Sequence, residues 1–515
     1  MAAGNKPLVY VSPLNERFAV PDAPKKCLWK ESLGKNIPSP HTRENWKHNY
    51  KIYPDVLSLI GNTPMVKLNK IPKEYGLTCN VFVKCEFLNP GGSVKDRMAK
   101  RVFEDAEKQG LIHPGMTIIE PSSGNTGIAV ALISAIKGYK CVIVMSEKIS
   151  QEKEAVITSL GATVVRVPVT EDSFSPNGLF GTVARLRQEI PNSFVFDQFS
   201  NPSNPLTHYD TTAEEILDQL DNKVDLIVFG GGTGGTITGI GRKFREISPN
   251  TKIVGFDPEG SQFAYPPELN RSDTKFWEVE GMGYEFIPAT LDQAVCDYWI
   301  KTTDMEALPL ARKLMRDEGL LVGMSAGAGL AAAIKVGKEL KAGQNVVVIL
   351  PDSIRNYMTK FVSDQWMEAK GYQPCVNKLN LWWWDKKVSD LKYKKALTVS
   401  ADEPLANVLD VLKRNNAPGA CVLNRDGTLL GTVTTQAVRN KLISGTASSD
   451  DPITRFTVRV LPKLDINSSL GRASRILEKD PFAIVIEIRG SGSSRQEIPI
   501  GSIEGEDLLE YISRR

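Results

Sequence analysis

Short β-branched runs alternate with amphipathic stretches from about residue 52 to about residue 371. Each apolar run is followed by a turn rich in glycine and serine and then by a helical pattern; examples are NVFVKCEF, KCVIVM, VDLIVF and QNVVVIL. Strands that are buried on both faces read as continuous apolar runs, and the helices between them supply the parallel crossovers. The pattern therefore predicts an α/β core over residues 46–371, built on a twisted, mostly parallel sheet that helices cover on both faces.

The pattern changes on both sides of this core. Residues 1–45 are rich in Pro, Lys, Asn and Ser and have little periodicity, so we expect an irregular extension there. Residues 372–394 also break the pattern and are expected to form a linker, anchored by the tryptophans at 382–384. Residues 395–515 contain a weak internal repeat in which each copy reads strand, helix, strand, turn, strand, helix. Because each helix has one apolar stripe that needs a partner, we expect the two copies to pack together as one α+β domain.

Composition narrows the functional classes. Of the 515 residues, 41% are hydrophobic and 24% are charged, which is ordinary for a folded protein and too apolar for a disordered one. Lys and Arg number 63 against 60 Asp and Glu, without a dense basic stripe, so nucleic acid is not expected as a partner. Residues 1–10 lack the apolar core of a signal peptide, and no apolar stretch is long enough to span a membrane, so we expect a cytoplasmic protein. Seven scattered cysteines without a Cys-x-x-Cys pair argue against a disulfide framework or a zinc ribbon.

Four turns rich in small residues each join a predicted strand to a helix, and two of them lie in the first half of the core. Residues 91–97 (GGSVKDR) place Lys95 at the start of a helix, where desolvation would lower the pKa of its amine toward nucleophilic reactivity. Taken alone, Lys95 reads more simply as a solvated lysine. Residues 121–127 (PSSGNTG) offer hydroxyls and free N–H groups at a helix N-terminus, which suits a carboxylate; the alternative is an ordinary polar N-cap.

The other two turns lie later in the core. Residues 230–236 (GGGTGGT) expose backbone N–H groups that can surround a phosphate. This turn also fits the G-x-G-x-x-G spacing of dinucleotide-binding proteins, with Asp257 about twenty residues later. A dehydrogenase, however, would leave the first two turns without a role. Residues 323–329 (GMSAGAG) could bring the Ser325 hydroxyl to a buried ring nitrogen, or could serve close helix packing.

A lysine, a carboxylate-binding turn, a phosphate-binding turn and a late serine are together the groups that pyridoxal phosphate and an amino acid require. The chain also contains the stretches IGNTP (60–64), EGMGY (280–284) and LPDS (350–353). With these motifs, residues 52–371 resemble the fold-type II pyridoxal-phosphate enzymes, the group of tryptophan synthase β and cysteine synthase.

This resemblance implies a role for each motif. Lys95 would be the catalytic residue and bind the cofactor covalently, Asn125 would contact the 3′-oxygen of the cofactor, and Ser325 would contact its pyridine nitrogen. The residues expected at the cofactor phosphate are Gly232, Thr233, Gly234, Gly235 and Thr236. The residues expected at the amino-acid substrate are Ser122, Ser123, Thr126, Gln198, Gly283 and Tyr284.

Within this group, the N-terminal flank resembles the cystathionine β-synthase family of animals. Residues 27–29 (CLW) and 39–41 (SPH) match the haem-binding extension of that family. The resemblance implies a haem b whose iron takes Cys27 and His41 as axial ligands, with Arg242 as the charge partner of the thiolate. From spacing alone, a cysteine and a histidine in a loop would indicate nothing.

The same resemblance implies a reaction. L-serine and L-homocysteine would condense to L-cystathionine and water by β-replacement, and hydrogen sulfide production from cysteine is left open. Two alternatives also stay open: a cysteine synthase acting on O-acetylserine would share every core residue named above, and a non-catalytic sensor could hold both cofactors. The family suggests a homodimer or a larger homo-oligomer.

The C-terminal repeats resemble the tandem regulatory CBS domain, which binds adenosyl ligands in many proteins. Ala417, Pro418 and Gly419 stand where family members that respond to S-adenosylmethionine have an aromatic, an acidic and an amide residue. Glu504 stands where they have a threonine, whereas Asp507, suited to a ribose diol, is retained. The sequence therefore predicts weak or absent binding of S-adenosylmethionine.

Overall fold

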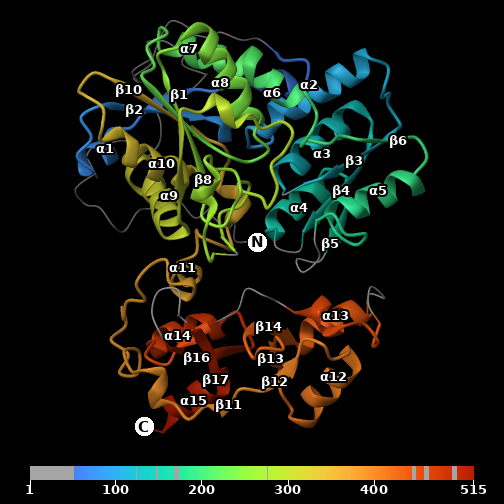
Figure 1. Ribbon diagram of the computed structural model, residues 1–515, viewed down its shortest axis with the longest axis vertical. Helices are drawn as coiled ribbons and strands as arrows, with labels where there is room; N and C mark the ends of the chain where they lie inside the picture. Colours follow the sequence, from blue (N-terminus) through green and yellow to red (C-terminus); the bar gives the residue numbers. More distant parts are fainter. Residues whose placement is uncertain are drawn as a thin grey trace, which may run out of the picture. The chain divides into compact units, whose positions relative to one another are not determined.

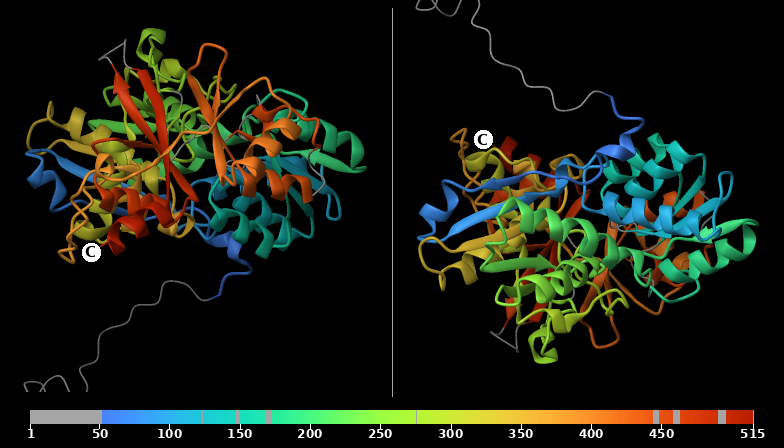
Figure 2. Two further views of the ribbon diagram at one scale, coloured as in Figure 1. Left: turned by 90° about the horizontal axis from the view of Figure 1, so that it is seen from below. Right: turned by 90° about the horizontal axis from the view of Figure 1, so that it is seen from above.

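The computed structural model of the chain describes residues 52–122, 124–146, 149–167, 173–274, 276–443, 448–457, 463–489 and 496–514. The chain divides into two compact units, residues 1–54 and residues 55–515, and the helices and strands described belong to the second. Figures 1 and 2 show these elements coloured along the sequence.

A six-stranded sheet forms one part of the core, with the strand order β1-β2-β10-β7-β8-β9. Neighbouring strands run parallel except β1 and β2, which are antiparallel. This arrangement confirms the predicted mostly parallel sheet, and its central strands come from the apolar runs VDLIVF and QNVVVIL. The strands are β1 (Met65–Lys67), β2 (Asn80–Cys85), β7 (Leu226–Gly230), β8 (Lys252–Pro258), β9 (Tyr298–Thr302) and β10 (Asn345–Leu350).

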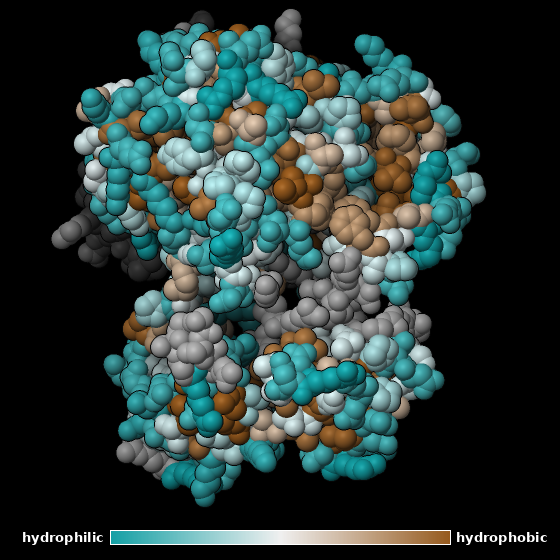
Figure 3. Space-filling model, in the orientation of Figure 1, coloured by the Kyte–Doolittle hydropathy of each residue, from teal (hydrophilic) through white to brown (hydrophobic). Residues whose placement is uncertain are grey.

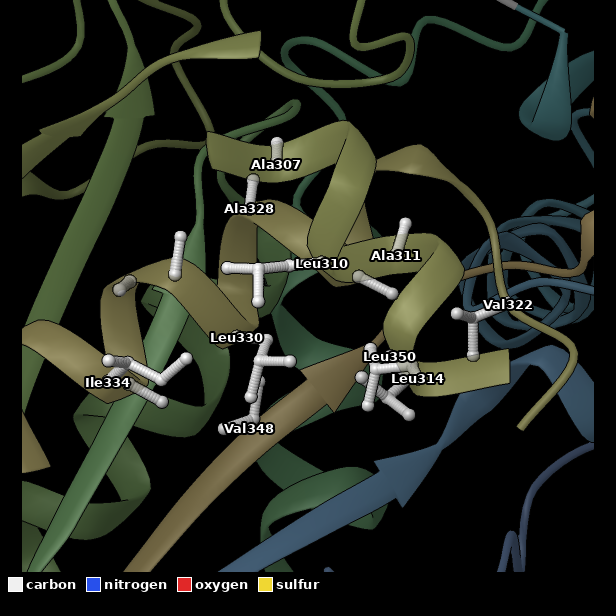
Figure 4. Packing of buried hydrophobic residues seen from close by; sticks show 14 of the residues in the cluster. Ala307, Leu310, Ala311, Leu314, Val322, Ala328, Leu330, Ile334, Val348 and Leu350 are labelled. Atoms are coloured by element: carbon white, nitrogen blue, oxygen red, sulfur yellow. The ribbon is translucent and has the colours of Figure 1, made fainter. Parts of the chain in front are cut away.

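Strand β10 shows why helices cover both faces of this sheet. Val348 and Leu350 lie in one hydrophobic cluster, against the helices α9 (Asp304–Glu318) and α10 (Met324–Gly337) (Figure 4). Val347 belongs to a different cluster on the opposite face, together with side chains of helices α7 and α8. Successive side chains of a strand alternate between its two faces, so a fully apolar strand needs a helix layer on each side.

A second, four-stranded sheet has the order β5-β4-β3-β6, and all its strands are parallel. Its faces alternate in the same way: Ile118 and Ile143 pack on the side of α2 and α3, whereas Ile119 and Val144 pack with α5 on the other side. The sequence predicted the parallel strands but not their division into two sheets. The strands are β3 (Thr117–Pro121), β4 (Lys140–Ser146), β5 (Thr163–Val167) and β6 (Ser193–Val195).

Helices and short turns complete the core. The remaining helices are α1 (Ile71–Glu74), α2 (Lys95–Lys108), α3 (Asn125–Lys137), α4 (Gln151–Ser159), α5 (Leu179–Glu189), α6 (Ser203–Thr207), α7 (Ala213–Gln219), α8 (Gly235–Ile247) and α11 (Asp364–Lys370), and a π-helical turn spans His208–Thr212. Short 3₁₀ turns of the second unit lie at Val56–Leu59, Glu86–Leu88, Pro267–Asn270, Gln293–Val295, Ile354–Tyr357, Val388–Asp390 and Ile453–Phe456.

The C-terminal part consists of two copies of one motif. In each copy a short strand pairs in parallel with the first strand of an antiparallel hairpin, and a helix follows each of these two units. This order confirms the predicted internal repeat; the longer hairpin, β16 and β17, is red in the left view of Figure 2. The first copy contains β12 (Thr398–Ser400), α12 (Leu405–Arg414), β13 (Gly419–Leu423), β14 (Leu429–Thr434) and α13 (Thr435–Ile443). The second contains β15 (Lys463–Asp465), α14 (Leu470–Leu477), β16 (Phe482–Arg489), β17 (Gln496–Glu504) and α15 (Gly505–Ser513), and β11 (Lys394–Lys395) pairs with β17.

The two copies pack against each other as expected, because Cys421 of β13 shares a hydrophobic cluster with Phe482 and Ile484 of β16. Gly419 leaves room for this contact, since a Cβ at Gly419 would lie 2.4 Å from the Phe482 ring.

Helix α11 packs against α14 of the second copy. Glu368 of α11 is buried and pairs with Arg475 of α14 at 2.7 Å. The Arg475 guanidinium also lies 4.9 Å from the ring centre of Trp384, whose Nε1 donates to the Cys375 carbonyl. Trp384 is thus a buried anchor of the segment 372–394, whereas the exact domain boundaries stay predictions.

Figure 3 shows hydrophilic residues over much of one face, with smaller hydrophobic patches between them. Among the described residues, no helix combines the length and apolarity needed to cross a membrane.

Candidate functional site

Turns that lie far apart in the sequence surround one pocket at the carboxyl ends of β7 and β10. Its lining includes Lys95, Asn125 and Ser325, each from the beginning of a different helix, and the glycine turn between β7 and α8. The sequence-predicted residues that line the pocket are Lys95, Asn125, Gly232, Thr233, Gly234, Thr236 and Ser325.

Lys95 is the first residue of α2 and follows a tightly held turn. Gly92 adopts φ +83°, a conformation that favours glycine, and its carbonyl accepts a hydrogen bond from Ser353 N at 3.1 Å. Burial lowers the pKa of the Lys95 amine to about 8, and the nearby Asp352 carboxylate opposes this effect. About a tenth of the amine is therefore uncharged at pH 7, far more than for a solvated lysine, and the lowered pKa agrees with the sequence-based expectation.

The glycine turn provides space and backbone donors. A Cβ on Gly232 would lie 2.8 Å from the Gly281 carbonyl oxygen and 3.7 Å from Lys95 Nζ, so only glycine leaves the pocket open beside the lysine. Gly234 adopts φ +91° immediately before α8, whose first N–H groups have no partner inside the helix. These N–H groups at a helix N-terminus suit an anion such as a phosphate.

Two further members of this turn have polar neighbours of their own. Thr236 Oγ1 lies 3.2 Å from Nε2 of His208, and burial lowers the pKa of His208 to about 3, so the ring is neutral. Gly235 does not line the pocket: a Cβ there would meet Asn204 Oδ1 at 1.9 Å, so this glycine allows the close approach of Asn204. Asn204 in turn donates to Thr233 Oγ1 at 2.8 Å.

Asn125 and Ser325 complete the predicted cofactor set. Asn125 begins α3, and its Nδ2 donates to Asp352 Oδ2 at 2.7 Å while its Oδ1 accepts from Asn356 Nδ2 at 3.0 Å. Ser325 is the second residue of α10 and is buried. Two residues earlier the chain needs a glycine, because a Cβ on Gly323 would lie 2.0 Å from Asp352 Oδ1.

Three of the predicted substrate residues, Ser122, Thr126 and Gln198, are buried and do not line this pocket. Ser122 Oγ accepts from the N–H groups of Gly124 and Gly127 at 3.0 and 2.7 Å. Thr126 Oγ1 donates to Gln198 Oε1 at 2.7 Å, and Gln198 Nε2 donates to a backbone carbonyl. All three side chains are buried and bonded within the protein, and none of them lines the pocket.

Of the other predicted substrate residues, Ser123 lies outside the described residues. Gly283 N donates to the Gly231 carbonyl at 2.7 Å, which holds the segment beside the glycine turn. Tyr284 contacts the rings of Phe199 and Phe286 at centroid distances of 5.3 Å. The substrate roles of this whole set stay predictions.

The sequence did not single out the buried ion pairs at the other side of the pocket. Glu280 lines the pocket and pairs with Lys153 of α4 at 2.7 Å and with Lys360, and both Glu280 and Lys153 are fully buried. Burial would raise the pKa of Glu280, but Lys153 and Lys360 together lower it, so this carboxylate is ionised. The stretch 280–284 resembled the family, yet nothing in its spacing pointed to a lysine more than a hundred residues earlier.

The pocket residues fit pyridoxal phosphate. A desolvated amine can attach the aldehyde, an open glycine turn at a helix N-terminus can accept the phosphate, and a buried neutral hydroxyl can reach a ring nitrogen. The dinucleotide alternative fits less well. Asp257 is buried, pairs with Lys301 at 2.6 Å and does not line the pocket, so its carboxylate is already engaged.

The haem ligands Cys27 and His41 lie outside the described residues. Arg242 is on α8 and pairs with Asp292 at 2.8 Å, with 59% of its side chain exposed. Within the described part of the chain no cluster of His, Cys, Asp and Glu could hold a metal ion.

In the C-terminal repeats, three positions expected to affect adenosyl-ligand binding, Pro418, Glu504 and Asp507, make hydrogen bonds or ion pairs within the protein. The Pro418 carbonyl accepts from Thr435 N and Oγ1, both at 2.9 Å. Glu504 pairs with Lys394 at 3.2 Å, and Asp507 Oδ2 accepts from Glu504 N at 2.8 Å, where it caps α15.

Comparisons with known proteins agree with this site. Residues 56–352 match the family described as pyridoxal-phosphate dependent enzyme, and residues 388–444 match the CBS domain. The chain is 46% identical to cystathionine beta-synthase of Oryctolagus cuniculus (96% of this chain, 91% of the relative) and 44% identical to that of Apis mellifera (96% and 98%). It is also similar to the crystal structure of the O-acetylserine dependent cystathionine beta-synthase from Helicobacter pylori, with a TM-score of 0.56, 37% identity, and coverage of 60% of this chain and 99% of that one. The chain therefore belongs to the cystathionine beta-synthase family of pyridoxal-phosphate dependent enzymes.

Proposed function

We propose that the protein condenses L-serine with L-homocysteine to L-cystathionine and water, with pyridoxal phosphate bound covalently through Lys95. The observation that carries this proposal is the convergence of Lys95, Asn125, the glycine turn and Ser325 on one pocket. Similarity over nearly the full length to enzymes named cystathionine beta-synthase supports the choice of reaction.

When bound, pyridoxal phosphate supplies an electron-withdrawing ring that stabilises negative charge at the α-carbon of an amino acid. Ser325 offers the ring nitrogen a neutral hydroxyl instead of a carboxylate, which weakens this effect and favours β-elimination over transamination. Asn125 would donate to the 3′-oxygen, and the N–H groups at the start of α8 would hold the phosphate.

Lys95 would also act as the general base. Its amine, with a pKa of about 8, would take the α-proton of serine, and the bond from the β-carbon to the hydroxyl group would break. The homocysteine thiolate would form the new C–S bond at the β-carbon, and Lys95 would return a proton to the α-carbon, so the thiol proton of homocysteine and the departed hydroxide together account for the water. The turn at Ser122, Thr126 and Gln198 would hold the substrate carboxylate at the N-terminus of α3.

The same proposal includes the haem and the assembly. Cys27 and His41 would ligate the iron of a haem b, which would have a structural or redox-sensing role, and Arg242 would neutralise the thiolate. The protein would be a homodimer or a larger homo-oligomer. S-adenosylmethionine would bind weakly or not at all, and calorimetric titration of the full-length protein, with product formation measured in parallel, tests this.

The decisive experiment supplies purified protein with homocysteine and either serine or O-acetylserine, and identifies the product by mass spectrometry. We expect cystathionine from serine. Preference for O-acetylserine with sulfide, yielding cysteine, would favour the cysteine synthase alternative, and no turnover with either substrate would favour a sensor. An absorption spectrum of the same sample, with base-released pyridoxal measured separately, tests both cofactors.

A further inference from the structure

The turn after β10 connects three of the four turns of the proposed cofactor site, those that carry Lys95, Asn125 and Ser325. Its residues Pro351, Asp352 and Ser353 belong to the LPDS stretch, which the proposed reaction leaves without a role. Val94 N donates to the Pro351 carbonyl at 2.8 Å, beside Lys95, and Gly323 N donates to the Asp352 carbonyl at 2.9 Å, two residues before Ser325. The backbone at 351–353 thus fixes the turns that bring the lysine and the serine into the pocket.

The Asp352 side chain reaches the third turn. It is 1% exposed, and its Oδ2 accepts hydrogen bonds from Asn125 Nδ2 at 2.7 Å and from the Tyr357 hydroxyl at 2.5 Å. Because Oδ2 acts as an acceptor toward both neighbours, the atom of Asn125 that faces Asp352 is the amide nitrogen. On its other side the amide oxygen of Asn125 accepts from Asn356 Nδ2 at 3.0 Å.

Asn125 lines the pocket, and its amide has a second N–H besides the one that donates to Asp352; in the protein alone the Tyr357 hydroxyl lies close enough to interact with the Asn125 side chain. If the amide turned over, its oxygen would face the carboxylate and its NH₂ would face another NH₂ group. Asp352 and Asn356 therefore set a single orientation of Asn125.

Burying the Asp352 carboxylate at this position destabilises the folded protein by itself. Its Oδ1 is buried and has no hydrogen-bond partner among the described residues, and a Cβ on Gly323 would lie 2.0 Å from this atom. An unpartnered buried carboxylate oxygen destabilises a fold, and such costs are concentrated at functional sites. The remaining oxygen makes the contact with Asn125, which points to a role in the site rather than in folding.

We propose that Asp352 is a positioning residue, which orients the Asn125 amide so that its remaining N–H donates to the 3′-oxygen of pyridoxal phosphate. The inference rests on the proposed cofactor binding but not on the identity of the amino-acid substrates. Its effect should therefore appear in cofactor affinity and in the absorption spectrum of the bound cofactor, with no substrate present.

The test is a double-mutant cycle with Asp352→Ala and Asn125→Ala. Apoprotein of each variant is titrated with pyridoxal phosphate, and the dissociation constant and the visible absorption maximum are recorded. Each single change should weaken cofactor binding roughly ten-fold, because a hydrogen bond of about 1.5 kcal/mol is lost. The double variant should bind no more weakly than Asn125→Ala alone, because Asp352 acts through Asn125.

Two further variants separate orientation from folding. Asp352→Asn keeps an oxygen acceptor for Asn125 Nδ2 and should restore most of the affinity and the wild-type absorption maximum. Tyr357→Phe removes the other donor to the same oxygen and should leave both readouts close to wild type. A strong effect of Tyr357→Phe, with none of Asp352→Ala, would overturn the proposal.

Equal losses from Asp352→Ala in the wild-type and Asn125→Ala backgrounds would also overturn it, because Asp352 would then act independently of the amide. If Asp352→Ala and Asp352→Ser both fail to fold while Asn125→Ala folds, the residue is structural and the proposal is wrong. Failure of the wild-type protein to bind pyridoxal phosphate would instead reject the proposed function. If the double-mutant cycle gives the expected cofactor affinities but the wild-type protein forms no cystathionine, the proposed reaction is rejected and the role of Asp352 remains supported.

Discussion

The turn at residues 230–236 and the turn at residues 121–127 both open a helix at the candidate active site, but they present different chemistry. The first exposes backbone N–H groups and glycines to the pocket. In the second, the polar atoms of Ser122 and Thr126 are already bonded inside the protein, partly to Gln198. The cofactor side is therefore prepared for a permanent anion, whereas a substrate carboxylate would have to exchange existing hydrogen bonds for new ones.

Loss of Lys95 should have the largest effect. Lys95→Ala removes both the covalent attachment and the general base, so turnover should fall by at least ~10²-fold while the fold remains. Cystathionine formation measures turnover, and far-UV circular dichroism measures whether the fold is retained. Lys100→Ala, on the same helix but outside the pocket, is the matched control. Near wild-type turnover in Lys95→Ala would contradict the assignment of the site.

The pH dependence of cofactor capture should be the second largest effect. The neutral amine is the nucleophile, and burial lowers the pKa of Lys95 to about 8. Below that pKa the neutral fraction rises about tenfold per pH unit, so the rate at which apoprotein binds pyridoxal phosphate covalently should climb to about pH 8 and then level off. Stopped-flow absorption measures this rate, and Lys95→Ala apoprotein should show no such phase. A flat profile between pH 6 and pH 8 would mean that another group attaches the cofactor.

A side chain in the glycine turn should damage the cofactor side alone. In Gly232→Ala the Cβ would lie 2.8 Å from the Gly281 carbonyl oxygen, and relief of this contact must move the turn. Strain of about 1–3 kcal/mol should lower cofactor affinity by roughly five- to 150-fold. Gly505→Ala, where a Cβ has open space, is the control. Unchanged cofactor content after dialysis of Gly232→Ala would show that the turn does not hold the phosphate.

A change in the second turn should produce the smallest and most selective effect. Thr126→Val removes the hydroxyl that bonds Gln198 and keeps the shape of the side chain, so KM for serine should rise about five-fold, the value of one hydrogen bond of about 1 kcal/mol. The cofactor spectrum should not change. The control is Thr158→Val, whose hydroxyl bonds only its own helix. If Thr126→Val lost the cofactor and kept an unchanged KM for serine, the turn at 121–127 would hold the cofactor and not the substrate.

Much of the core follows from local sequence pattern. The apolar runs of β7 and β10 predict strands buried on both faces, and the small residues after them predict turns with accessible N–H groups. Lys95, Asn125, Gly232 and Ser325 were expected together because one cofactor needs all four, and the structure brings them to one pocket.

What sequence could not predict is which charged groups meet. Lys153 lies in a helix with a polar pattern and reads as solvated, yet it is fully buried against Glu280. Asp352 and Asn125 are 227 residues apart, and their contact depends on how the two sheets are placed. The depth of Ser122 and Gln198 likewise depends on the packing of α3, which no local periodicity determines.

The contact between α11 and α14 affects which C-terminal truncations the folded protein tolerates. Glu368 finds its cation, Arg475, in the second repeat rather than the first. A premature stop after the first repeat would remove α14, so the ion pair with Arg475 and the helix packing that covers Glu368 would be lost together. The stop would also expose Ala369 of α11, which packs against the hydrophobic cluster of the second repeat. Trp366 and Met367 of α11 also belong to the hydrophobic core of the catalytic part, so a stable shortened enzyme should keep α11 and carry an uncharged residue in place of Glu368. A frameshift near residue 460 should be more damaging to the catalytic core than its distance from the active site suggests.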